Sequence, residues 1–168
     1  MLLSEIPKNV NCIKVYNFKD QSRKFNFLST NSKNVKKNSI FFINKKNNFK
    51  KKYIYEAIEK GAVAIITNYY FRSINIPQFL VRDIDTSLLL LLKRMKKIPP
   101  QNIIGITGTN GKTSVVWIIT NILNKLKIKT KMYGTLGYYK NLIKKEDNDL
   151  TTPEYEILYQ SAFSKTSV

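Results

Sequence analysis

The sequence predicts an α/β protein in which a small N-terminal α/β domain precedes the first part of a second domain with a parallel sheet. Candidate strands and helices alternate along the chain, as they do where helices pack on a sheet. The continuous apolar run 62–66 is typical of a strand that is buried on both faces. The pair Pro99-Pro100 stops the preceding helix, so we place the two domains at 1–98 and 99–168.

Five segments of the first domain have the composition of strands. Ser39–Ile43 has strong β propensity, and a hydroxyl-rich turn at 29–33 stands before it. The expected strands are residues 12–16, 25–28, 39–43, 62–66 and 78–82.

Two segments of the first domain are expected to be helices. Residues 53–60 have apolar side chains on one helical face, and Gly61 is suited to end that helix. The second helix is expected to be capped by Asp85 or Thr86 and to run to about Lys97. Its basic last turn suits the negative end of the helix dipole.

The second domain opens with the strand, loop and helix order of a phosphate-binding site. The β-branched run 103–106 predicts a strand, the loop closes on Gly111-Lys112-Thr113, and an amphipathic helix runs to about Lys127. Because apolar residues recur in this helix at helical spacing, we expect their face to pack on a sheet. These residues are Val115, Ile118, Ile119, Ile122, Leu123 and Leu126.

The rest of the second domain predicts a strand, a loop and a helix. Residues 128–133 are expected to form a strand parallel to the first one, in a right-handed β-α-β crossover. The polar stretch 138–149 is expected to be a loop or a hairpin. Thr152, with Pro153 at the first helical position, is expected to cap a helix that runs toward Gln160.

The composition restricts the chemistry open to these residues. The sequence has no histidine and a single cysteine, Cys12, which excludes a disulfide framework, a cysteine/histidine zinc site and histidine-based catalysis within it. Its start lacks the pattern of a signal peptide, and the longest apolar run, 88–92, is too short to span a bilayer. We therefore expect a cytoplasmic protein with no membrane partner.

The formal net charge of +18 has two interpretations. One is a partner made of nucleic acid or anionic lipid. The other is a general over-use of lysine, which occurs in candidate helices, loops and strand ends alike. Because the charge is spread along the chain, we favour the second interpretation and expect no nucleic-acid partner. A basic protein that acts on nucleic acid through its phosphate loop stays an alternative.

The glycine-rich loop carries the clearest chemical signal. Backbone N–H groups and the helix N-terminus of such a loop bind polyphosphate. Lys112 would place its charge on the phosphates, and the Thr113 hydroxyl would bind Mg²⁺. The spacing departs from that of the common P-loop, because the first glycine position falls on Ile106. We expect a nucleotide with Mg²⁺ at this loop.

The segment Gly105-Ile106-Thr107-Gly108-Thr109-Asn110-Gly111-Lys112-Thr113-Ser114 resembles the ATP loop of the Mur ligase superfamily. That superfamily comprises the ATP-dependent amide ligases of peptidoglycan assembly and the folylpolyglutamate synthetases. Residues 30–33 with 39–42 resemble the signature of the UDP-binding N-terminal domain, which the folate enzymes lack, and 56–64 resemble the segment after it. Residues 134–137 with 151–154 resemble the pattern of the MurE-type ligases, which add the third residue of the peptide.

The resemblance implies a ligase that uses ATP and Mg²⁺ to form an amide bond of a peptidoglycan precursor. ATP would phosphorylate the D-glutamyl carboxylate of UDP-N-acetylmuramoyl-L-Ala-D-Glu. The amine of a diamino acid, meso-diaminopimelate, would then attack the acyl phosphate and release phosphate. A cytoplasmic monomer is expected.

The resemblance also implies roles for individual residues. Ser32 would contact the uridine-diphosphate part of the substrate, with an ordinary turn hydroxyl as the alternative. Thr151 and Thr152 would contact the muramoyl substrate, with a helix cap as the alternative. Lys112 would act as the catalytic residue on the β- and γ-phosphates, with Thr113 on Mg²⁺. The residues expected to hold ATP are Gly108, Thr109, Asn110, Gly111, Lys112, Thr113 and Ser114.

The chain departs from the family pattern in three ways. Asn31 and Lys33 replace an aspartate and an arginine, which removes an acceptor and a planar fork of donors. Asn47 lies near a further family contact, at a position shifted by a length difference. The metal-binding residues and amino-acid-binding domain that follow in the family have no counterpart, so we expect an N-terminal portion without complete activity. A MurF-type ligase and a remnant that binds UDP-sugar or ATP without turnover stay alternatives.

Overall fold

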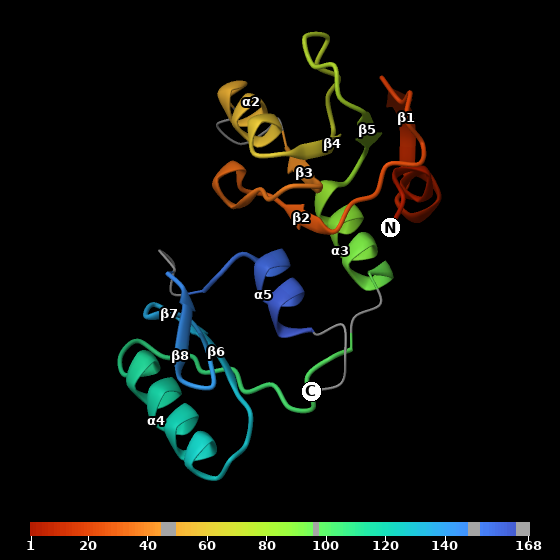
Figure 1. The fold of residues 1–168 in the computed structure, drawn as a ribbon. Coiled ribbons are helices and arrows are strands. Elements are labelled where there is room, and N and C mark those ends of the chain that lie inside the picture. The colour runs from red at the N-terminus through yellow and green to blue at the C-terminus, as the bar shows by residue number, and fades with distance from the viewer. Residues whose placement is uncertain (45–49, 96–97, 148–151, 164–168) are drawn as a thin grey trace. The chain divides into compact units, whose positions relative to one another are not determined.

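The computed structural model describes residues 1–44, 50–95, 98–147 and 152–163 of the 168-residue chain. The chain divides into two compact units, Met1–Lys97 and Ile98–Val168 (Figure 1). Helices and strands occur in both units, and the first contains a parallel sheet, which confirms the α/β class.

The first unit is built on a five-stranded sheet. Its strands are β1 (Cys12–Tyr16), β2 (Phe27–Ser29), β3 (Ser39–Ile43), β4 (Ala62–Thr67) and β5 (Gln78–Val81). Their order is β1-β5-β4-β3-β2, and all neighbours are parallel except β1, which pairs antiparallel with β5. Every residue of β3 and β4 is buried, as expected of central parallel strands covered on both faces.

Two helices, α2 (Lys52–Glu59) and α3 (Ile84–Arg94), lie on opposite faces of this sheet (Figure 1). Ile54 of α2 packs in one buried cluster with Phe41 of β3 and Ile65 of β4. Because side chains alternate along a strand, the neighbouring positions of β3 and β4 point to the face where α3 lies. The sheet is thus the middle layer of a three-layer unit.

The first eleven residues form two short helical turns that the sequence pattern did not predict. They are η1 (Leu3–Glu5) and α1 (Ile6–Asn9), and α1 packs on α3. Leu3 and Ile6 have no exposed surface, so this segment completes the core on the α3 side.

The predicted strands and helices of this unit are confirmed, two of the strands with the predicted ends and the other elements with ends within about three residues. The helix α2 ends as expected, because Gly61 follows it with a positive φ of 99°. The predicted caps of α3 are wrong, since its N-cap is Asp83. The Asp83 carboxylate accepts the Thr86 backbone N–H at 3.0 Å and the Thr86 hydroxyl at 2.7 Å. Thr86 is thus the main donor to this cap, and neither its side chain nor that of Asp85 is the capping acceptor.

The second unit contains three antiparallel strands and two helices. The strands are β6 (Lys131–Gly134), β7 (Gly137–Lys140) and β8 (Ile143–Glu146), in that order in the sheet. The helices are α4 (Lys112–Lys125) and α5 (Tyr155–Ala162). The amphipathic helix after the loop is therefore confirmed, and β7 with β8 forms a hairpin within the stretch predicted as loop or hairpin.

The strand predicted at 103–106 does not form. Ile103 and Ile104 are 73% and 62% exposed, and no described strand pairs with them. The strand predicted at 128–133 forms only at Lys131–Gly134, antiparallel to β7. A hairpin partner nearby in sequence costs less loop-closure entropy than a crossover, so β6 pairs with β7. The predicted β-α-β crossover is absent from the described part of this unit.

Helix α4 packs on its sheet with only one face. The Trp117 ring meets Tyr139 of β7 edge-on at 5.4 Å between centroids, and the Asn124 amide donates to the Thr130 hydroxyl at 2.6 Å. The prediction that the whole apolar set packs on a sheet is wrong for the other face. Its residues are 44–65% exposed, namely Val115, Ile118, Ile122 and Leu126.

Helix α5 begins later than predicted. Its N-cap is Glu154, without a side-chain cap bond, so the prediction that Thr152 caps it is wrong. A proline disfavours helical backbone in the residue before it, and Pro153 therefore keeps Thr152 outside the helix. At the other end, Lys131 donates to two carbonyl oxygens of the last turn at 3.0 and 3.2 Å.

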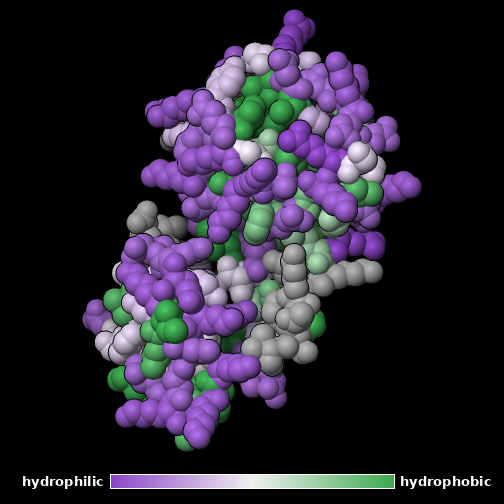
Figure 2. Space-filling model, viewed as in Figure 1, coloured by the Kyte–Doolittle hydropathy of each residue, from purple (hydrophilic) through white to green (hydrophobic). Residues whose placement is uncertain are grey.

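Hydrophilic residues cover much of the face shown in Figure 2, on both units, and do not gather in one area of it. Among the helices that the structure describes, none has both the length and the apolar character needed to cross a bilayer.

Candidate functional site

The glycine-rich loop of the second unit leads directly into α4. Gly111 is the N-cap of α4 and has a φ of 76°, in the left-handed region that favours glycine. Gly108 also has a positive φ, 149°. A Cβ on Gly111 would meet no atom within 4 Å, so the backbone angle and not crowding selects glycine there. The two glycines bend the chain into the first turn of the helix.

The first turn of α4 presents open backbone amides. The first backbone bond of the helix joins the Val115 N–H to the Gly111 carbonyl at 2.9 Å. Among the described residues, no acceptor takes the backbone N–H of Lys112, Thr113 or Ser114, and Gly111 has no side chain to cap them. Unpaired N–H groups at a helix N-terminus bind anions, and the helix dipole adds to the attraction.

The Lys112 side chain folds back over the loop. Its ammonium donates to the Gly108 carbonyl at 2.5 Å and to the Thr109 carbonyl at 3.3 Å. An ammonium has three N–H donors, and two are used here. The charge is thus held beside the open amides, with a donor left for an anion.

Thr113 is the one predicted metal ligand in this loop. It is half-buried in the first turn of α4, next to the open amides. The described residues contain no group of three or more histidine, cysteine, aspartate or glutamate side chains that could hold a metal. The Thr113 hydroxyl would supply one oxygen ligand to a Mg²⁺ ion whose other ligands are phosphate oxygens and water, which is the usual way that Mg²⁺ binds with nucleotides.

Ser32 lies in the first unit, in the short helical turn η2 (Ser32–Asn34) after β2. It is only 5% exposed, and its hydroxyl donates to Glu56 Oε2 of α2 at 2.8 Å. Lys60 donates to Glu56 Oε1 at 2.7 Å and to the carbonyls of Ser32 and Lys33, both at 3.2 Å. The predicted substrate contact is therefore part of a polar cluster that joins η2 to α2.

The charge of Glu56 is stabilised within this cluster. Hydrogen bonds from the Lys60 ammonium and, second, from the Ser32 hydroxyl hold the pKa of the Glu56 carboxyl below its usual value. Glu56 is therefore an acceptor with no proton to donate at neutral pH. Sequence reasoning did not assign Glu56 or Lys60 a role. Their spacing of four residues on one helix is a signal for a pair, but nothing local indicates that Ser32 joins it.

The two threonines predicted to contact the muramoyl substrate are not brought to the loop by any described contact. Thr151 lies outside the described residues, as does Asn47. Thr152 is exposed in a bend before α5. The loop residues 108–114 are brought together by the turn itself, and the role of each predicted site residue stays a prediction.

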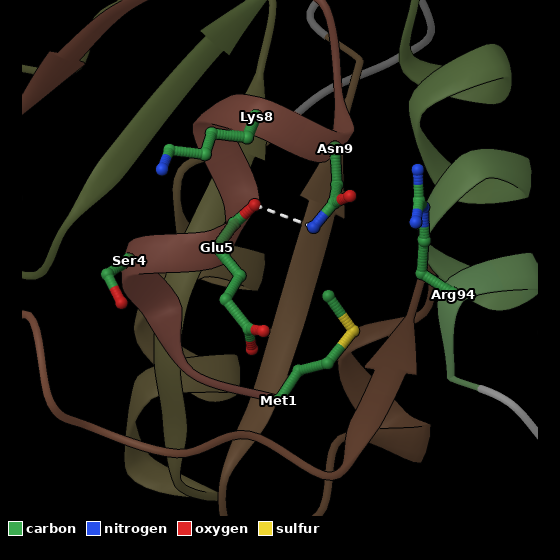
Figure 3. A pocket seen from close by; sticks show the side chains of 6 residues that line it. All are labelled: Met1, Ser4, Glu5, Lys8, Asn9 and Arg94. Carbon is green, nitrogen blue, oxygen red and sulfur yellow. Dashed lines mark hydrogen bonds between the residues drawn. The ribbon is translucent and has the colours of Figure 1, made fainter.

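The first unit also has a surface pocket that is lined by none of the predicted site residues (Figure 3). Its volume is about 440 Å³, and its lining consists of Met1, Ser4, Glu5, Lys8, Asn9 and Arg94. The Asn9 amide donates to the Glu5 carbonyl at 2.8 Å, and Glu5 Oε2 accepts the Leu2 N–H at 2.6 Å (Figure 3 shows the first of these). These bonds serve the local turns η1 and α1.

Residues 106–167 match the family model of the Mur ligase middle domain. This range starts within the glycine-rich loop and covers most of the second unit.

Curated relatives match across both units. The chain is 36% identical over 132 residues to the UDP-N-acetylmuramoyl-L-alanyl-D-glutamate--2,6-diaminopimelate ligase of Rickettsia prowazekii, covering 76% of this chain and 28% of that protein. It is 35% identical over 136 residues to the ligase of the same name from Rickettsia typhi, covering 79% of this chain and 28% of that protein. The chain therefore spans about 28% of the length of these relatives.

A solved structure of a UDP-N-acetylmuramoyl-L-alanyl-D-glutamate--2,6-diaminopimelate ligase has the same fold over 96% of this chain and 32% of that chain. The TM-score is 0.59 and the sequence identity is 22%.

Proposed function

Because the chain belongs to the Mur ligase family, we propose that it carries the nucleotide-handling part of an ATP-dependent ligase of peptidoglycan precursor synthesis. The substrate would be UDP-N-acetylmuramoyl-L-Ala-D-Glu, and the added group would be a diamino acid. Both are the compounds that the names of the relatives give for those enzymes. The chain spans about 28% of the length of those relatives. The complete ligase activity is therefore proposed here and is not shown by the comparison.

The loop is proposed to hold the phosphates of ATP. The open amides of Lys112, Thr113 and Ser114 would donate to phosphate oxygens, and the Lys112 ammonium would neutralise charge on the β- and γ-phosphates. The Thr113 hydroxyl would be the protein ligand of Mg²⁺, which bridges the same phosphates. Gly108, Thr109, Asn110 and Gly111 would form the wall of the loop by backbone contacts.

The proposed reaction is an acid–amine ligation. An oxygen of the D-glutamyl carboxylate attacks the γ-phosphorus of ATP, and ADP leaves. The amine of the diamino acid, meso-diaminopimelate, then attacks the carbonyl carbon of the acyl phosphate. An amide bond forms, phosphate leaves with the electron pair of the broken C–O bond, and the amine nitrogen releases one proton to solvent. The protein's part is to position the phosphates and neutralise their charge, which is the main source of catalysis in phosphoryl transfer.

The first unit is proposed to bind the UDP part of the substrate through Ser32. Thr151 and Thr152 are proposed to contact the muramoyl part, as the resemblance implies. We further propose that the protein acts in the cytoplasm as a monomer, without a nucleic-acid partner. Sedimentation of the purified chain at several concentrations measures its molecular mass in solution, which is expected to stay that of a monomer.

The observation that carries the proposal is the open first turn of α4 with the Lys112 ammonium beside it. The test is calorimetric titration of the purified chain with MgATP and, separately, with UDP-N-acetylmuramoyl-L-Ala-D-Glu. Saturable binding of each ligand with one site per chain is expected. A chain that binds neither ligand would contradict the proposal. Single-stranded DNA is the control, and tight binding that weakens steeply with salt would favour the nucleic-acid alternative.

A further inference from the structure

A closed set of hydrogen bonds joins Ser32 to helix α2 of the first unit. Each oxygen of the Glu56 carboxylate takes one bond, Oε2 from the Ser32 hydroxyl at 2.8 Å and Oε1 from Lys60 at 2.7 Å. The side chains of Lys60 and Glu56 are 38% and 36% exposed, whereas Ser32 is nearly buried. The cluster therefore reaches the surface, with Ser32 at its inner end.

The carboxylate fixes the direction of the bond from Ser32. A serine hydroxyl has one proton to donate and two lone pairs that accept, whereas an ionised carboxylate only accepts. The Ser32 proton must therefore point to Glu56. Among the described residues, no donor bonds to the Ser32 oxygen. Toward any ligand, the Ser32 side chain is thus an acceptor.

Lys60 offers no further donor at this site. Its ammonium has three N–H groups, and three acceptors surround it, namely Glu56 Oε1 and the carbonyls of Ser32 and Lys33. Among the side chains of Ser32, Glu56 and Lys60, no donor is therefore left for a phosphate group, which only accepts. The cluster is suited to a ligand group that donates.

Ser32 lies near the edge where sheets of this kind bind ligands. Parallel strands bind ligands outside their carboxyl ends. Ser32 follows the carboxyl end of β2, and Asn44 and Asn68 follow those of β3 and β4. The Asn68 amide donates to Asn44 Oδ1 at 3.0 Å, so the ends of the two central strands are joined.

We propose that Glu56, held by Lys60, is a positioning residue that makes Ser32 an obligate acceptor for the imide N–H of the uracil base. In UDP the diphosphate oxygens only accept and the ribose hydroxyls can both donate and accept, whereas the ring N–H of uracil can only donate and so requires an acceptor. This inference rests on the proposed function, in which Ser32 contacts the UDP part of the substrate. The new content is that Ser32 recognises the base. Glu56, 24 positions away in the sequence, determines that Ser32 accepts the hydrogen bond from the base and does not donate it.

The test compares UDP with CDP, because ring nitrogen N3 donates in uracil and accepts in cytosine. The wild-type chain is expected to bind UDP about tenfold more tightly than CDP. A difference of this size is usual when a ligand that makes a hydrogen bond is compared with one that leaves the same protein group without a partner. In Glu56→Gln, the Lys60 ammonium is expected to donate to the new amide oxygen. The amide N–H₂ then faces Ser32 and donates to the Ser32 oxygen. The Ser32 proton is then free for the ligand, and the preference is expected to invert toward CDP.

Two further variants separate this role from a structural one. Glu59→Gln makes the same chemical change at an exposed position of the same helix, and it should keep the wild-type ratio of the two dissociation constants. Ser32→Ala should bring the ratio close to one. Thermal unfolding of each variant shows whether the unit is still folded, because a purely structural bond would change stability and leave the ratio alone.

The outcomes are distinct. If UDP binds and the ratio of the dissociation constants of UDP and CDP is the same in Glu56→Gln as in the wild type, the inference is wrong and the proposed UDP site stands. If the wild-type chain binds no UDP, the proposed function of this unit fails and the inference fails with it. A ratio that inverts in Glu56→Gln and persists in Glu59→Gln supports both.

Discussion

The ammonium of Lys112 lies over the loop that precedes it, 2.5 Å from the carbonyl oxygen of Gly108. Two positive φ values, at Gly108 and Gly111, turn the chain so that this contact and the open amides of α4 lie together. Positive charge and unpaired N–H groups in one short loop fit a polyphosphate.

We predict that Lys112→Met weakens the binding of MgATP by roughly 10- to 100-fold, the usual effect of losing hydrogen bonds to a charged group. Calorimetry gives the dissociation constants. Lys125→Met, at the far end of α4, removes the same charge from the chain and should bind MgATP as the wild type does. Equal losses in the two variants would mean that net charge and not the loop attracts ATP.

Gly111→Ala should destabilise the second unit through its backbone alone. The new Cβ meets nothing within 4 Å, but a φ of 76° costs a non-glycine residue about 1–2 kcal/mol. The chain has a single tryptophan, Trp117 in α4, so its fluorescence follows the unfolding of this unit. Gly105→Ala, which also meets nothing within 4 Å and has no positive φ, is the matched control and should be neutral or slightly stabilising. An equal loss in both variants would contradict this account.

Gly61→Ala should be more harmful, because two effects combine. Its φ is 99°, and the added Cβ would lie 2.9 Å from the Lys37 Cα, a backbone atom that cannot rotate away. We expect a loss of more than about 2 kcal/mol of unfolding free energy in the first unit. Chemical denaturation followed by circular dichroism measures it. An unchanged unfolding curve would show that the turn after α2 is not rigid.

The cap of α3 predicts a pH dependence. The Thr86 backbone N–H and then the Thr86 hydroxyl hold the pKa of the Asp83 carboxyl below its usual value. A lowered pKa stabilises the folded state above the unfolded pKa of about 3.9, and this contribution is lost as the pH falls through the folded value. Asp83→Ala should therefore unfold a few degrees lower than the wild type at pH 7, with a difference that shrinks below about pH 3.9.

Asp83→Asn is the matched variant for that cap. Asparagine is also a good N-cap but does not titrate, so it should keep most of the stability at pH 7 and show no such pH dependence. If the difference between wild type and Asp83→Ala were the same at acid and neutral pH, the carboxylate would not be the source of the effect.

The first unit could largely be predicted from the sequence because its patterns are local. The run 62–66 is apolar throughout, and a central parallel strand is what such a run can form. Three polar residues suited to caps, Asp83, Asp85 and Thr86, stand close together at the start of α3, and their pattern alone does not distinguish them. Only the observed bonds show that Asp83 accepts and Thr86 donates.

The second unit and the Ser32 cluster depend on distant contacts, which patterns do not show. The run 103–106 has the composition of a strand, but a strand needs a partner, and β6 pairs with β7 instead. Likewise, the hydroxyl of Ser32 could be identified as a candidate contact. Its bond to Glu56 crosses 24 positions of the sequence, and no local rule predicts it.

The proposed function depends above all on ATP binding at the loop before α4. The most direct test is an amide NMR spectrum of the ¹⁵N-labelled chain, recorded with increasing MgATP. We predict that the largest shifts fall on Gly108 to Ser114, above all on the amides of Lys112, Thr113 and Ser114, and that Lys112→Met weakens them. Shifts that leave these amides unchanged and appear elsewhere, or a spectrum that MgATP does not alter, would contradict the claim.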